Sequence, residues 1–363
     1  MTDRRAFMAM CAAATIAPRL AACAGVPDGE YDAATSTLRN PLPTTPQFAS
    51  LVRFATLAPN GHNTQPWRFA ELATGARILP DLTRRTPIVD PDDHHLWISL
   101  GCAAENFLVA SAAAGRPGAM TYMNEGSGYI DLDLAQGTAR VTPLFRAITS
   151  RQSTRSLYDG RMVAAEHLAL LEVAARTEGV ALTVITDPRR CEAITHFVER
   201  GNDAQMDDPR FVRELRDWIR FNSEAAITTG DGLFSGCTGN PALPSWFGRR
   251  FFGMIFTKDA EDKKYAAQMR SSAGVAVFVG DQADKDHWTR VGRSFQRFAL
   301  QATALGIRHC MINQPVEVPA VRAEFARWLG IGDQRPDLVV RFGHALPMPM
   351  SMRRPPPAVI VTA

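Results

Sequence analysis

Apolar side chains recur along this chain with two different periods. Three segments carry small and apolar residues at helical spacing, namely residues 46–57, 101–115 and 292–306. A Pro-Asn-Gly turn after Ala58 ends the first of them, because proline and glycine interrupt a helix. Shorter apolar runs predict strands, beginning with one at Trp67. The other predicted strands cover residues 129–134, 180–185, 275–279 and 338–342.

Two of the predicted helices resemble each other. Residues 101–115 and 292–306, aligned without gaps, share Gly101 with Gly292, Phe107 with Phe298, Ala113 with Ala304, and Gly115 with Gly306. Such identities also arise by chance between buried helices, so the pattern alone leaves an internal duplication open. The interleaved helices and strands disfavour a helical bundle and predict an α+β or α/β sheet covered by helices.

Residues 227–252 interrupt this pattern. They contain five glycines and two prolines without any periodicity, together with the aromatic residues Phe234, Trp246 and Phe247. A segment of this length is either disordered or a functional lid. Its aromatic residues favour a lid that packs on the rest of the protein.

The N-terminal residues 1–23 look like an export signal. Arg4 and Arg5 precede twelve uncharged residues, which span about 18 Å as a helix and are too short to cross a membrane. The arginine pair followed by phenylalanine resembles a bacterial twin-arginine signal, which implies a periplasmic protein. The residues up to Cys23 are similar to a lipoprotein processing site, so a lipid on Cys23 is the expected contact with the membrane. An amphiphilic first helix is the alternative, which Pro18 and Pro27 weaken.

Residues 24–45 are expected to form a linker, because they are rich in proline, glycine and threonine. The remaining length allows two domains or one duplicated unit. The chain has 46% hydrophobic and 21% charged residues, a composition typical of globular proteins. This composition excludes a disordered, collagen-like or coiled-coil structure for the bulk of the chain. The 40 basic and 37 acidic residues are scattered, which predicts no nucleic-acid partner. Six well-separated cysteines offer no zinc-binding spacing.

The densest cluster of polar side chains follows the first helix. Asn60, His62, Asn63 and Gln65 lie between two prolines just ahead of the strand at Trp67. Carboxamides both donate and accept hydrogen bonds, which suits a planar ring with alternating C=O and N–H groups. A hydrogen-bonded turn that caps the strand remains the alternative for any single one of them.

Two pairs of arginines are candidates for an anion site. Arg151 and Arg155 would share one face if their segment were helical, and neighbouring hydroxyl groups would complete a phosphate site. Arg353 and Arg354 form the second pair near the C-terminus. The alternatives are two solvated arginines for the first pair and a charged tail for the second.

Residues 90–95 combine three aspartates with two histidines. Carboxylates and imidazoles can bind a divalent metal, but this composition is more typical of a capped helix start, so no metal site is predicted. The sequence contains no nucleophile elbow, phosphate loop or dinucleotide fingerprint, which removes support for hydrolases and kinases.

Four segments, in their order along the chain, resemble the nitroreductase superfamily. They are residues 59–67, Arg151-x-x-x-Arg155, residues 313–317, and Arg341-Phe342-Gly343 leading to the tail at 349–355. More narrowly they are similar to the Acg-type branch, in which two nitroreductase-like halves are fused in one chain. The resemblance spans residues 46 to 357. Asn60 departs from the family pattern, which more often has serine there.

The resemblance implies an α+β fold of two fused halves, each with a sheet covered by helices. The first half is expected at residues 46–146 and the second at 147–363, with a lid at 227–252. FMN would bind where the halves meet. Because the halves then complete each other, the assembly is a monomeric pseudo-dimer or a homodimer.

The resemblance also implies the contacts of the cofactor. Arg151 and Arg155 would bind its phosphate with Arg353 or Arg354, while His62, Asn63, Gln65, Asn313 and Gln314 would border its ring system. Donors along the N1 edge of a reduced flavin lower its energy, so no catalytic acid or nucleophile is required of the protein.

The function expected from the resemblance is that of an FMN-dependent oxidoreductase of nitroreductase type. It would reduce a small electron-poor acceptor such as a nitroaromatic or a quinone. The electron donor stays open, because nicotinamide cofactors are scarce outside the cytoplasm. The alternative is a noncatalytic protein that binds or sequesters FMN beneath the lid.

Overall fold

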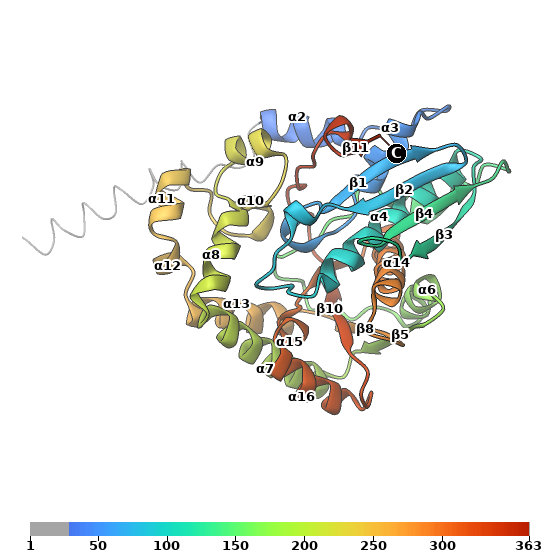
Figure 1. Cartoon of the computed structure of the whole chain (residues 1–363). Coiled ribbons are helices and arrows are strands. Elements are labelled where there is room, and N and C mark those ends of the chain that lie inside the picture. The colour runs from blue at the N-terminus through green and yellow to red at the C-terminus, as the bar shows by residue number, and fades with distance from the viewer. Residues whose placement is uncertain (1–28, 363) are drawn as a thin grey trace, which may run out of the picture.

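Two long helices cross at the centre of the molecule. The structure is a computed structural model that describes residues 29–362, and its helices α4 (His94–Ala113) and α14 (Lys285–Ala304) pack along each other (Figure 1). A Cβ atom on Gly101 would lie 2.0 Å from the carbonyl oxygen of Thr289. A Cβ atom on Gly292 would lie 2.1 Å from that of Ile98. Each glycine thus meets the residue three positions before the other, as at a two-fold axis, which supports the interpretation of two fused halves.

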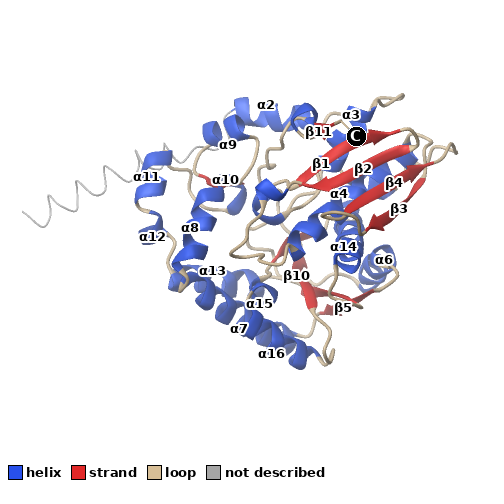
Figure 2. Ribbon diagram, viewed as in Figure 1, coloured by secondary structure: helices blue, strands red, loops and turns tan. Residues whose placement is uncertain are grey.

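Each half contributes one sheet, coloured red in Figure 2. The five-stranded sheet has the order β11-β1-β2-β4-β3, formed by β1 (Trp67–Leu72), β2 (Gly75–Pro80), β3 (Gly118–Met123), β4 (Tyr129–Leu134) and β11 (Ile360–Val361). The four-stranded sheet is antiparallel in the order β5-β8-β10-β9, formed by β5 (Val180–Ile185), β8 (Gly274–Gly280), β9 (Arg308–Met311) and β10 (Pro336–Gly343). The α+β class is therefore confirmed.

The second sheet is covered on both faces. Every residue of β8 and β10 is buried, as expected for strands between two layers of helices. Ala276 and Phe278 belong to the core around α14, whereas Val275 and Val277 pack into a separate core with α7 and α16. Because successive side chains of a strand point to opposite faces, alternate residues of β8 pack into the two different hydrophobic cores.

The remaining elements surround these sheets. The helices are α2 (Gly29–Leu38), α3 (Phe48–Thr56), α5 (Pro143–Ala147), α6 (Ala165–Ala175), α7 (Pro188–Met206), α8 (Pro209–Trp218), α9 (Ser223–Thr229), α10 (Ser235–Thr238), α11 (Ser245–Arg250), α12 (Phe252–Ile255), α13 (Lys258–Arg270), α15 (Gln314–Glu317) and α16 (Pro319–Leu329). Short 3-10 turns are η1 (Gly61–Asn63), η2 (Leu82–Arg84) and η3 (Pro356–Ala358), and β6 (Ile219–Arg220) pairs with β7 (Leu233–Phe234).

Two predicted boundaries require correction. The linker predicted at 24–45 is wrong over residues 29–38, because these form α2, whose Tyr31 is fully buried and contacts the ring of Phe234 at 4.7 Å. The second half does not extend to the C-terminus as one unit. Its tail returns to the first half, where β11 pairs with β1 in parallel.

The predicted lid at 227–252 is not one irregular loop. It contains the end of α9, β7, α10 and α11, and it reaches the start of α12. Glycine ends two of these helices in the left-handed region, with φ of 65° at Gly230 and 76° at Gly239. Gly230 and Gly239 therefore mark helix ends rather than disorder.

Of the helices that the structure describes, α4 is long and apolar enough to span a membrane. Its most apolar window is 83% buried inside the protein, which identifies it as a core helix. The export signal predicted at residues 1–23, including Cys23, lies outside the described residues.

Candidate functional site

A cavity of about 220 Å³ opens where the two halves meet. The first half contributes the turn after α3 and the buried face of α4, and the second half contributes residues 310–317 and α13. Leu233 and Thr238 from the lid segment close a further wall. The site is therefore assembled by the whole chain rather than by either half.

The turn after α3 is strained. His62, Asn63 and Gln65 have φ of 46°, 54° and 54°, in the left-handed region that glycine favours. The main-chain N–H of Gln65 donates to Asn60 Oδ1 at 2.7 Å, which closes the turn. Strain of this kind persists only where the surroundings hold it, and it is enriched at ligand sites.

Asn63 and Gln65 use their amides to fix neighbouring segments. Asn63 Nδ2 donates to the carbonyl oxygen of Gly232 at 3.0 Å. Gln65 Nε2 donates to the carbonyl oxygen of Gly230 at 2.9 Å, and its Oε1 accepts from the N–H of Arg354 at 2.8 Å. The turn thus anchors the base of the lid and the C-terminal tail. Asn63 borders a second, smaller cavity, whereas Gln65 lines neither cavity.

His62 lies on the wall of the larger cavity. Its Nδ1 is buried and has no hydrogen-bond partner among the described residues. Burial, with the positive charge of Arg155 nearby, lowers the pKa of His62 to about 4. The imidazole is therefore neutral at pH 7 and contributes one donor and one acceptor rather than a positive charge.

The smaller cavity, of about 40 Å³, adjoins the larger one and is rich in arginine. Arg39, Arg151, Arg155 and Arg353 line it, and no carboxylate residue does. None of the ion pairs within residues 29–362 involves these four side chains. A cluster of guanidinium groups without a counter-ion is a site for an anion.

Arg151 and Arg353 are buried and also hold the end of α3. Arg151 Nη2 donates to the carbonyl oxygen of Leu57 at 2.7 Å, and Arg353 Nε donates to that of Thr56 at 2.6 Å. Cations are favourable at a helix C-terminus. However, Nε and Nη1 of Arg151 are buried without any partner in the described part of the chain, which leaves two donors for a ligand.

Burial and mutual repulsion act on these arginines. Burial, together with the positive charge of Arg39, lowers the pKa of Arg151 to about 10. Burial first, and then the charges of Arg39 and Arg151, hold the pKa of Arg353 well below its usual range. A bound anion would relieve both effects.

Two predicted contacts come from α15 and its N-cap. Asn313 and Gln314 both line the larger cavity. Asn313 Oδ1 accepts from the N–H of Val339 at 3.0 Å and so ties the turn to β10. Gln314 Oε1 is buried and has no hydrogen-bond partner among the described residues.

Arg354 is placed apart from the other predicted residues. It lines neither cavity, and its side chain donates to the carbonyl oxygen of Ala358 at 2.8 Å and approaches Asp81 at 3.7 Å. The segment of Arg151 and Arg155 is irregular rather than helical, yet both residues reach the smaller cavity. Arg39 reaches it as well. Sequence reasoning missed this residue because it lies in the predicted linker.

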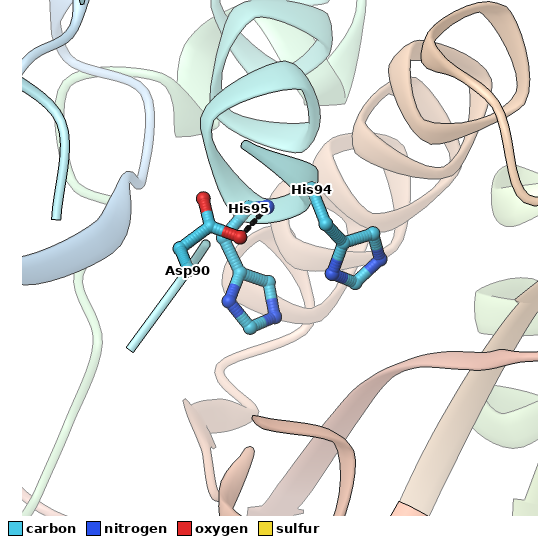
Figure 3. Close-up of side chains that lie close together, drawn as sticks. All are labelled: Asp90, His94 and His95. Atoms are coloured by element: carbon cyan, nitrogen blue, oxygen red, sulfur yellow. Dashed lines mark hydrogen bonds between the residues drawn. The ribbon is translucent and has the colours of Figure 1, made fainter. Parts of the chain in front are cut away.

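Asp90, His94 and His95 form a cluster at the start of α4 (Figure 3). Both carboxylate oxygens of Asp90 accept main-chain N–H groups, from His95 and Leu96, at 3.0 Å each. His94 Nε2 is 2.7 Å from Asp337 Oδ1, and burial with nearby positive charge lowers the pKa of His94. The oxygens of Asp90 are thus used by the helix, which supports the interpretation of a capped helix start.

No family model matches the chain. Two known proteins of Mycobacterium tuberculosis are similar to it in sequence. "Putative NAD(P)H nitroreductase Rv3131" is 27% identical over 347 residues, which cover 90% of this chain and 94% of that protein. "Putative NAD(P)H nitroreductase acg" is 26% identical over 327 residues, which cover 87% and 93%. These similarities confirm the resemblance to the nitroreductase superfamily and its Acg-type branch.

Solved structures match more weakly. A nitroreductase with bound FMN from Bacteroides fragilis is 16% identical, covers 57% of this chain and 90% of its own, and has a TM-score of 0.36. The FMN-dependent nitroreductase NfnB from Mycobacterium smegmatis, in complex with NADPH, is 14% identical, covers 56% and 87%, and has a TM-score of 0.37.

Proposed function

We propose that this chain is an FMN-dependent oxidoreductase of nitroreductase type. The observation that carries the proposal is the pair of adjoining cavities in the seam between the halves. One is surrounded by arginines, and the other is wider and mixes apolar with polar side chains. Arg155 and Asn60 border both, so a single elongated ligand can occupy the two together.

The arginine cavity fits a phosphate group. Arg151 offers two buried donors without a partner, and the side chain of Arg155 makes no ion pair with the described residues. Phosphate oxygens accept charge-assisted hydrogen bonds from guanidinium groups, and their negative charge would balance the cluster. Arg39 and Arg353 complete the positive surroundings.

The wider cavity fits a flat heterocycle. His62 Nδ1 and Gln314 Oε1 are buried there without partners in the described residues. They come from opposite halves of the chain, and a ring with alternating C=O and N–H groups would satisfy them. Cys102 and Phe295, from α4 and α14, add apolar surface for stacking.

When bound, FMN supplies two-electron transfer from a donor to an acceptor. The chain itself binds the cofactor, orients it and shields it from water. Because burial keeps the pKa of His62 low, its neutral imidazole serves as a ring contact, and a proton delivered to the acceptor comes from another source.

We infer that the acceptor is a small electron-poor molecule such as a nitroaromatic or a quinone. NAD(P)H is the donor to test first, since both relatives are named as NAD(P)H nitroreductases. The paired arginines at the N-terminus support export to the periplasm, where a quinol or a redox protein would replace NAD(P)H.

Sequestration of FMN is the second candidate, because the lid segment is firmly attached. Asp231 at its base forms ion pairs with Arg84 and with Arg220, the latter at 2.6 Å. The amides of Asn63 and Gln65 hold the adjacent carbonyl groups. A fixed lid would keep a bound flavin away from substrates.

Anaerobic mixing of the flavin-loaded protein with NADPH tests the proposal. Bleaching of the flavin absorbance, followed by its return on addition of a nitroaromatic or a quinone, is expected for the enzyme. A flavin that dithionite reduces but NADPH does not would indicate sequestration or another donor, and a reduced quinol would then be tested. A purified protein that binds no FMN at micromolar concentration would overturn both candidates.

A further inference from the structure

The lid segment presents an apolar patch to solvent. Trp246 on α11 is 71% exposed and Met254 on α12 is 76% exposed. Phe247 and Phe251 lie half-buried between them, with ring centroids 4.6 Å apart, and Trp246 contacts Phe247 at 5.6 Å. Ring contacts thus join the three aromatic residues, and these three with Met254 on the next helix are named here the aromatic patch. Large side chains gathered in this way on a protein surface usually mark a binding site.

The segment that carries the aromatic patch has charges of one sign. Arg249 and Arg250 are exposed next to it, and residues 232–258 contain no Asp or Glu. Neither arginine takes part in an ion pair within the described chain. The surface therefore combines exposed aromatic and apolar side chains with two unpaired cations.

The base of the aromatic patch is held rigidly. Phe252 is buried, and its ring lies 4.5 Å from Phe256 and 6.3 Å from Phe221. A Cβ atom on Gly248 would lie 2.2 Å from the ring of Phe221, so α11 packs closely on this residue. Phe256 also lines the larger cavity. The inward face of α11 and α12 thus packs on Phe221 and Phe256, and Phe256 connects it to the cavity wall.

We propose that the aromatic patch docks on an anionic lipid bilayer. Tryptophan and phenylalanine prefer the boundary between headgroups and acyl chains, and arginine binds the lipid phosphates. A bilayer with anionic lipids is complementary in both respects, since it offers an apolar interior beneath a negative surface. The complete lack of acidic residues in 232–258 favours this occupant over a protein surface of mixed charge.

The position of the N-terminus agrees with this orientation. The first described residue, Gly29, begins α2, which packs against α9, and Asn222 at the start of α9 donates to Ser245 Oγ of α11 at 3.1 Å. Figure 1 shows α2, α9 and α11 at one edge of the molecule, away from β3 and β4. Five residues lie between Cys23 and Gly29, so the six Cα–Cα steps reach at most about 21 Å. A lipid on Cys23 and the aromatic patch would therefore meet the same membrane.

Co-sedimentation with vesicles tests the proposal independently of the flavin. The full chain carries Cys23→Ser in every sample, so no acyl group contributes and the N-terminal segment is the same throughout. Vesicles contain phosphatidylcholine alone or with phosphatidylglycerol. Trp246→Ser with Met254→Ser is expected to weaken binding to anionic vesicles about tenfold or more, and Arg249→Glu with Arg250→Glu by a similar factor.

Matched controls replace exposed residues elsewhere. Leu170→Ser with Val173→Ser on α6, and Arg140→Glu with Arg189→Glu, change the same number of apolar or charged groups and should leave binding unchanged. Equal binding by the patch variants and the parent chain would overturn the proposal. So would patch variants that bind vesicles normally but lose self-association in sedimentation velocity, since the occupant would then be a second copy. Unchanged circular dichroism confirms that the variants fold.

Discussion

Arg155 differs from the other arginines of the small cavity in what its side chain does for the fold. Arg151 and Arg353 donate to the carbonyl groups that end α3, so they stabilise the helix as well as line the cavity. The hydrogen bonds of Arg155 run through its main chain, whose N–H donates to Met348 and whose carbonyl oxygen accepts from Gln268. Substitution of the Arg155 side chain therefore tests ligand binding with little effect on the stability of the fold.

Arg155→Ala should weaken FMN binding about ten- to hundredfold, because a hydrogen bond to a charged group contributes about 1.5–3 kcal/mol. The midpoint of urea unfolding without flavin should stay unchanged. Fluorescence titration of free FMN measures the first quantity. Arg146→Ala, an exposed arginine just ahead of the site, is the matched control and should bind FMN normally. Equal affinity in the two variants would remove Arg155 from the phosphate site.

His309 makes the stability depend on pH. It is fully buried, neither ring nitrogen has a partner among the described residues, and burial with the charge of Arg151 lowers its pKa to about 3. The unfolded chain titrates near 6.5, so between pH 6.5 and 3 the unfolded state binds the extra proton and stability falls with falling pH.

His309→Phe should remove this dependence. Between pH 7 and pH 5 the parent chain should lose about 2 kcal/mol more of its unfolding free energy than the variant does. Urea denaturation at the two pH values measures the difference. Substitution of the exposed His196 in the same manner should leave the dependence in place. Parallel pH profiles for the parent and His309→Phe would contradict the assigned neutral state.

Sequence reasoning at this scale found residues by chemical type but not by role. The turn from Asn60 to Gln65 was identified as ligand-facing, yet two of its amides hold the lid base and the tail. Such contacts join residues more than 160 positions apart, and no local pattern encodes them. Arg39 was not predicted as a site residue for the same reason. The segment around it is polar, and only its neighbours in the folded chain show that it lines the smaller cavity.

At the scale of helices and strands, the elements with a continuous or regularly spaced pattern of buried residues were the ones that the sequence predicted. β4 and β5 have the predicted limits, and β8 and β10 were predicted with ends one or two residues short, since their apolar runs are continuous. β2 and β3 were missed because glycine, alanine and polar residues interrupt their few large apolar side chains, and β3 is partly exposed. α2 was missed because a helix whose one buried aromatic residue docks on the distant lid has a weak amphipathic pattern of its own.

The crossing of α4 and α14 depends on glycine at both contact points. Gly101→Ala places a methyl group where the Thr289 carbonyl oxygen stands, and backbone on both sides leaves it no room. The variant should lose about 3 kcal/mol or more of unfolding free energy in urea, the upper end for overpacked cores. Gly253→Ala, where nothing lies within 4 Å, should change it by less than about 1 kcal/mol. A tolerated Gly101→Ala would mean that the helices lie further apart.

The base of the lid depends on Asp231, which holds two arginines. Asp231→Asn leaves Arg84 and Arg220 without their carboxylate and should loosen the lid. Release of FMN, followed by flavin fluorescence after dilution, should then become about tenfold faster. Asp217→Asn, an exposed neighbour, is the control. An unchanged rate of FMN release would show that Asp231 does not control the opening of residues 227–252.

For the molecule as a whole, both halves of the chain contribute to the lining of the two cavities. The arginines that line the smaller cavity come from the turn after α2, from the segment after α5 and from the tail. Because these segments lie far apart in the sequence and meet at one place, we expect one flavin site per chain.

One FMN per monomer is the expected stoichiometry. In sedimentation velocity recorded at the flavin band, the absorbance should move with a species of the chain's own mass, 39.7 kDa before any processing, at a ratio of one flavin per chain. Flavin that sediments only with a dimer, and dissociates on dilution to the monomer, would show that a second chain completes the site. Two flavins per chain would show that both sides of the pseudo-two-fold axis bind the cofactor.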